Sequence, residues 1–121
     1  MSLLNWFNFS RKKTKNPEDD YIVVITDEQI VVTYPDGITE KVFWNDIQQI
    51  KLINTDWGPV SPDMWLTLIG ISEKCMIPMG AKGFDEIYDV VSKWEGFDFE
   101  QFGESMRCTD NKEFVLWTKK T

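Results

Sequence analysis

The apolar residues of this chain follow two different periods, and the change between them falls near Phe84. Upstream of Phe84, runs rich in β-branched and aromatic residues alternate with short turns, which is typical of strands. The six runs cover residues 21–26, 29–34, 38–43, 48–54, 64–71 and 75–79. Downstream, Phe84, Ile87, Tyr88, Val91 and Trp94 recur at the spacing of one helix face. Strands followed by helices predict an α+β fold.

The turn and cap residues define the remaining elements. Pro35, Asp36 and Gly37 predict a tight hairpin turn, because proline presets φ and glycine accepts a positive φ. Gly96 is expected to end the first helix, and Asp98 to cap a second helix that runs to about residue 106. Residues 113–119 form a last strand. We therefore predict a six-stranded antiparallel meander that makes a bent sheet or partial barrel, two helices and a closing C-terminal strand.

Two of the runs also indicate their place in a sheet. Residues 64–71 are nearly all apolar, which predicts a central strand covered on both faces. Pro78 cannot donate a ladder hydrogen bond, so its strand ends there or lies at an edge. Glu40 and Lys41 fall on opposite faces of the third strand, which indicates a sheet that is solvated on one side.

The first sixteen residues differ in character from the rest. With 121 residues, the chain fits an apolar-basic segment over 1–16 and one α+β domain over 17–121. The segment combines an apolar tip with a basic cluster, namely Leu3, Leu4, Trp6 and Phe7 followed by Arg11, Lys12, Lys13 and Lys15. Such a segment resembles an interfacial membrane anchor, in which each basic residue contributes about 1 kcal/mol near anionic lipid. The alternative is an ordinary N-terminus that packs on the domain or frays.

Charge restricts the class of partner. The formal net charge is −7, and because four of the 13 basic residues and no acidic residue lie in residues 1–16, the rest of the chain carries −11. Nucleic-acid binding needs clustered lysine and arginine, so we predict no nucleic-acid partner. An acidic body suits a basic protein instead.

The chain contains no histidine, which removes the usual general base, the common nucleophile pairs and most zinc sites. Cys75 and Cys108 form no CxxC motif, and we expect them to be free thiols of a cytosolic protein. We predict no catalytic residues, no metal and no cofactor. The competing enzyme hypothesis rests on Asp56 and Asp63, which would have to converge as an acid–base pair.

The longest break between strands covers residues 54–65 and holds two prolines, two aspartates and two tryptophans. Trp57 lies between Asp56 and Gly58, and an aromatic ring among carboxylates is typical of a contact surface for a basic partner. We therefore predict partner-binding residues Asp56, Trp57 and Asp63, together with Asp36 in the hairpin turn. Trp65 opens the central strand and is expected to be buried, while Trp57 is expected to be partly exposed. The alternative is that both tryptophans cover an edge of the core.

A spaced set of residues from position 58 onward follows a recognisable pattern. Its members are Gly58, Pro59, Asp63, Trp65, Leu68, Gly70, Cys75, Ile77, Pro78, Gly80, Ala81, Gly83, Gly96, Phe97, Asp98, Met106, Thr109, Asn111, Phe114 and Trp117. In these residues the chain resembles a family of small bacterial proteins and the immunity proteins encoded beside polymorphic or contact-dependent toxins. The corner at residues 44–50 is also similar to a turn of bacterial pleckstrin-homology-like domains, which end in a helix where this chain is predicted to end in a strand.

The resemblance implies a cytosolic protein that binds and neutralises a cognate toxin, and it assigns no catalytic residues. Together with the acidic body, it predicts a non-enzymatic immunity protein whose partner is a basic toxin, such as a nuclease. We expect a monomer or a weak dimer in the cytoplasm. The alternative is a peripheral adaptor at the inner membrane, tethered by residues 1–15.

Overall fold

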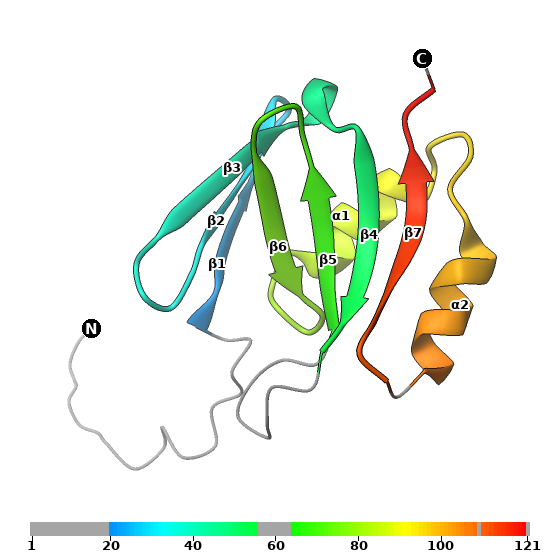
Figure 1. Ribbon diagram of the computed structural model, residues 1–121. Coiled ribbons are helices and arrows are strands. Elements are labelled where there is room, and N and C mark those ends of the chain that lie inside the picture. The colour runs from blue at the N-terminus through cyan, green and yellow to red at the C-terminus, as the bar shows by residue number, and fades with distance from the viewer. Residues whose placement is uncertain (1–19, 56–63, 109, 121) are drawn as a thin grey trace, which may run out of the picture.

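The computed structural model describes residues 20–55, 64–108 and 110–120, which form seven strands and two α-helices (Figure 1). The strands are β1 (Ile22–Ile25), β2 (Gln29–Thr33), β3 (Thr39–Phe43), β4 (Gln49–Asn54), β5 (Met64–Ile69), β6 (Lys74–Pro78) and β7 (Lys112–Thr118). The helices are α1 (Phe84–Val91) and α2 (Phe99–Arg107), and a 3-10 turn, η3, covers Trp44–Asp46. The predicted α+β class is confirmed. Among these described residues, no helix is long and apolar enough to cross a membrane.

The strands divide into two antiparallel sheets, so the prediction of one six-stranded meander is wrong. The first sheet has the order β1-β2-β3, and the second has the order β6-β5-β4-β7. The division occurs at η3, where the Trp44 backbone N–H donates to Glu28 O and the Trp44 indole donates to Thr26 O. These bonds hold the corner against the β1–β2 turn, and β4 then leaves to pair with β5 and β7 instead of β3. The two sheets do not close into a barrel.

The predictions for the hairpin turn and for the cap of α2 are confirmed, whereas the first helix ends earlier than the predicted stop at Gly96. Gly37 has a φ of +91°, and Tyr34 and Ile38 close the hairpin through a 2.8 Å backbone hydrogen bond. Asp98 caps α2, because its side chain accepts a 2.9 Å hydrogen bond from the Gln101 N–H. Gly96 has a φ of +93°, although the regular part of α1 already ends at Val91 and turns continue from there to the glycine.

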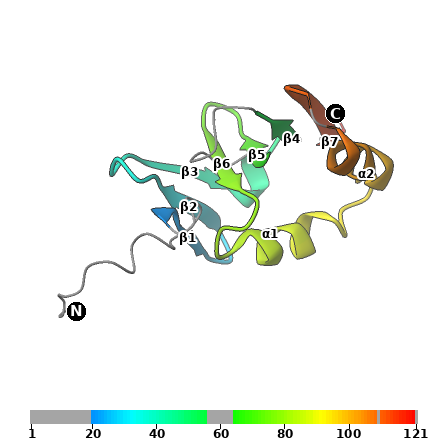
Figure 2. The ribbon, with the colours of Figure 1, turned by 90° about the horizontal axis from the view of Figure 1, so that it is seen from below.

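The core lies between the two sheets and α1, which runs beneath them, while α2 lies beside β7 (Figure 2). The first sheet contributes Ile30, Val32 and Val42, all fully buried. The predicted stripe faces inward: Phe84, Ile87 and Val91 of α1 are buried, while Tyr88 of α1 and Trp94, in the turns that follow it, are partly buried against the core.

The second sheet bears out both positional predictions. β5 lies between β4 and β6, and Trp65, Leu66, Thr67 and Leu68 in it are all buried, as expected for a central strand. Trp65 is 5% exposed, which confirms its predicted burial. β6 ends at Pro78 and forms one edge of the sheet.

Candidate functional site

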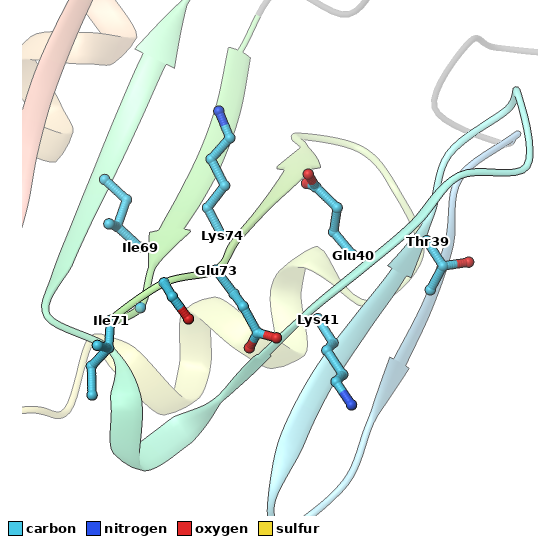
Figure 3. Close-up of a pocket in the computed structure, with 9 residues that line it drawn as sticks. Thr39, Glu40, Lys41, Ile69, Ile71, Glu73 and Lys74 are labelled. Atoms are coloured by element: carbon cyan, nitrogen blue, oxygen red, sulfur yellow. The ribbon is translucent and has the colours of Figure 1, made fainter.

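A cleft of about 830 Å³ lies between β3 of the first sheet and the β5–β6 hairpin of the second. Residues 39–41 form one wall and residues 69–74 form the other (Figure 3). The walls meet where Gly70 packs on Val42, since a Cβ at position 70 would lie 2.8 Å from Val42 Cγ2. The volume is in the range of natural ligand sites, roughly 300–1,000 Å³. The fold therefore leaves an open space where its two sheets adjoin.

The β3 wall presents unused backbone hydrogen-bonding groups. Tyr34 N donates to Ile38 O at one end of the β2–β3 ladder, and Trp44 N donates to Glu28 O at the other. Bonded and non-bonded pairs alternate along an antiparallel ladder. The bonds at the two ends make Tyr34–Ile38 and Glu28–Trp44 bonded pairs. Counting from either end, the pairs Thr33–Thr39 and Val31–Lys41 are therefore non-bonded. Thr39 and Lys41 therefore direct their backbone N–H and C=O groups away from β2.

The β6 wall is an edge that is partly satisfied. The Met76 N–H donates a 3.0 Å hydrogen bond to the Tyr34 hydroxyl, which donates in turn to Glu40 Oε1 at 2.5 Å. Lys74 lies two residues before Met76 and so directs its backbone groups to the same side. Pro78 has no N–H to offer. β3 and β6 are each at the end of their sheet order, so neither has a second strand partner among the described residues.

Four charged side chains line the cleft, two from each wall. Glu40 and Lys74 extend toward one end of the cleft in Figure 3, and Lys41 and Glu73 extend toward the other. Each end thus carries one acidic and one basic group. No ion pair joins these four residues to one another in the described part of the chain. Glu40 accepts the hydrogen bond from Tyr34 and Lys41 lies over the Phe43 ring, so none of the four charges is neutralised by another residue of the cleft.

Burial raises the pKa of two groups beside the cleft, the Tyr34 hydroxyl and the Cys75 thiol. Desolvation raises the pKa of the Tyr34 hydroxyl, and its hydrogen bond to Glu40 raises it further. Desolvation, reinforced by Glu40 and Glu73, raises the pKa of the Cys75 thiol to about 12. Both groups therefore keep their protons at neutral pH, and neither acts as a nucleophile or base there. Both cysteines are free, as expected. The described residues hold no group of three potential metal-ligand side chains.

Most of the residues predicted as sites fall in segments that the structure does not describe. These are the loop residues Asp56, Trp57 and Asp63, and the N-terminal residues Leu3, Leu4, Trp6, Phe7, Arg11, Lys12 and Lys13. Asp36 is described and exposed at the tip of the β2–β3 hairpin, where its carboxylate accepts a 3.0 Å hydrogen bond from the Ile38 N–H. It supports the hairpin turn and does not line the cleft.

The sequence interpretation missed the cleft residues Thr39, Glu40, Lys41, Glu73 and Lys74. Pro78 already marked one wall as an edge strand. The other wall becomes an edge only because the meander divides after β3, which no local pattern indicates. Comparison of the chain with protein-family models, with curated proteins and with solved structures finds no match.

Proposed function

We propose that the protein is a non-enzymatic binding protein that neutralises a basic protein toxin by direct contact, as an immunity protein does. The observation that carries the proposal is the cleft between the unpaired edges of β3 and β6. An exposed strand edge recognises an extended polypeptide by accepting it as an additional strand. In this proposal, an extended segment of the toxin pairs with Thr39 and Lys41 and lies between the two walls.

Charge supports a basic partner and a defined register. The net charge of −7 favours the approach of a positively charged protein and mainly increases the association rate. Within the cleft, two acidic and two basic side chains give no net charge. They therefore affect the register in which a guest strand binds more than they affect its net electrostatic attraction. The sequence resemblance to immunity proteins points in the same direction.

Replacing Lys41 with proline tests the strand pairing. Lys41→Pro removes a backbone donor that faces the cleft and takes no bond from the β2–β3 ladder. We expect Lys41→Pro to weaken toxin binding roughly three- to tenfold, the value of about one hydrogen bond. Isothermal titration with the purified product of the neighbouring toxin gene measures this change.

Lys41→Ala is the matched control, because it removes the side chain and keeps the backbone N–H. Binding that falls only for Lys41→Pro supports an added strand. Equal affinities for the wild type and both variants would exclude the cleft as the contact, and no heat of binding to any neighbouring gene product would contradict the immunity function itself. Circular dichroism of each variant verifies that the fold is retained.

A second candidate, the peripheral membrane adaptor, is favoured by the outer face of the first sheet. Ile22 and Val24 on β1 are 59% and 51% exposed, and in the sequence β1 begins six residues after the apolar-basic segment ends at residue 16. Apolar side chains beside basic residues suit the boundary of an anionic membrane. In this proposal residues 1–15 and this face contact lipid together.

Flotation with liposomes tests the adaptor. We expect full-length protein to float with anionic vesicles and not with neutral ones, because both the apolar and the electrostatic contributions are needed for a short anchor. Leu4→Glu with Phe7→Glu should abolish flotation. Ile38→Glu with Ile71→Glu, which places the same two charges at 59% and 72% exposed positions, serves as the control. Equal flotation of all variants would eliminate this candidate.

A further inference from the structure

A second concave surface lies where the β1–β2 turn, η3, α1 and the turn after α1 meet. It is a groove of about 410 Å³ whose walls include Trp44 and Trp94. The carboxylates of Asp27, from the β1–β2 turn, and Glu86, from α1, lie at the same groove. This tryptophan groove shares no residue with the cleft.

Both tryptophan rings of the groove are fixed by contacts with neighbouring residues. The Trp44 indole N–H donates to Thr26 O at 2.8 Å, which fixes its ring against the β1–β2 turn. Trp94 meets Trp44 edge-on, with ring centroids 6.1 Å apart and an interplanar angle of 74°. On its other side, Trp94 packs against Trp117 at 4.8 Å. Two fixed indole rings thus offer π-surface that a guest can use without ordering them first.

The charge at the groove is uncompensated. Asp27 and Glu86 are both exposed, and no lysine or arginine lines the groove. Neither carboxylate forms an ion pair within the described part of the chain. Lys93, in the turn after α1, already pairs with Asp89 at 3.3 Å. The two carboxylates and two indole rings of the groove would all attract a cation, and none of the residues that line the groove supplies one.

We propose that the tryptophan groove receives an arginine side chain of a protein partner. A guanidinium group stacks on aromatic rings and pairs with carboxylates through its planar N–H fork, which matches the two kinds of group present. The groove, at about 410 Å³, has about half the volume of the cleft, at about 830 Å³. The inference rests on the proposed function, because it gives the basic partner a defined contact outside the cleft.

The test uses full-length ¹⁵N-labelled protein and N-acetyl-arginine-methylamide as the probe. The expected result is a saturable shift of the Trp44 and Trp94 indole N–H signals, with the buried Trp65 signal unchanged. The neutral analogue N-acetyl-glutamine-methylamide should leave all three in place. Asp27→Asn with Glu86→Gln should weaken the arginine effect by about three- to tenfold, as expected for two exposed charge contacts.

A second double variant controls for net charge. Glu100→Gln with Asp110→Asn removes two exposed acidic groups that do not line the groove, and it should leave the titration unchanged. Equal shifts with both probes, no saturable shift, or equal weakening by both double variants would overturn the proposal. So would movement of the Trp44 and Trp94 signals, without probe, when Arg11, Lys12, Lys13 and Lys15 are all changed to glutamine, since the chain's own segment would then be the occupant.

The titration also separates this proposal from the proposed function. The probe requires no toxin, so the groove can bind arginine even if the protein is not an immunity protein. Conversely, toxin binding that responds to Lys41→Pro and not to Asp27→Asn with Glu86→Gln would uphold the cleft and remove the groove from the interface.

Discussion

Trp94→Ala is expected to lower the free energy of unfolding by about 3–5 kcal/mol, the usual cost of truncating a large packed ring. Trp94 lies between two other tryptophans, with centroid distances of 6.1 Å to Trp44 and 4.8 Å to Trp117. It therefore joins three parts of the chain, namely the corner η3, the turns after α1, and β7. Urea unfolding followed by circular dichroism gives the change in free energy.

Phe99→Ala is a suitable comparison, because it also deletes an aromatic ring but at a position that is 59% exposed. We expect the Phe99 variant to lose far less stability than the Trp94 variant. If the Trp94→Ala variant unfolded at the same urea concentration as the wild type, the packing of Trp94 would not contribute to stability and the expectation would be wrong.

Leu66→Ala should destabilise the protein by about 2–5 kcal/mol through loss of buried apolar surface and the cavity left behind. Leu66 has no exposed surface and lies on β5 directly between Leu52 of β4 and Ile77 of β6. Each of these neighbours is also fully buried. A lowered midpoint in thermal unfolding checks the expectation.

Leu66→Met nearly preserves the volume of the side chain and should cost less than about 1.5 kcal/mol. Ile71→Ala removes the same kind of aliphatic side chain from a 72% exposed position and should have little effect. If Leu66→Ala were no more destabilising than Ile71→Ala, the strand order of the second sheet would be in question.

Features that depend on neighbouring residues could be predicted from the sequence. The hairpin turn required a residue that tolerates positive φ, and Gly37 supplies it at +91°. Helix α2 required an acceptor at its first turn, and Asp98 supplies one for Gln101. Pro78 lies at a non-bonded position opposite Trp65, so its missing N–H falls on the open edge of β6 and breaks no bond to β5. In each case, a steric or hydrogen-bonding need is met within a few positions.

The partner of each strand edge could not be predicted in this way. Trp44 determines the direction of β4 through bonds to residues 26 and 28, which lie in a different hairpin. Gln49 on β4 contacts Thr118 on β7, a residue 69 positions away. The cleft depends on where the chain leaves the first sheet and on which strands β4 pairs with, so its walls were not recognisable from the sequence. The predicted exposure of Trp57 stays a prediction, because the structure does not describe that residue.

The pairing of β4 with β7 has a consequence for the order in which the protein folds. In the first sheet every strand pairs with its neighbour in the sequence. Contacts between residues so close in the sequence form quickly. β4 acquires its second neighbour only after residues 112–118 have been synthesised. Until then, the β4 edge is exposed on the ribosome-bound chain as a site for mispairing. We therefore expect β7 to be the last strand to dock.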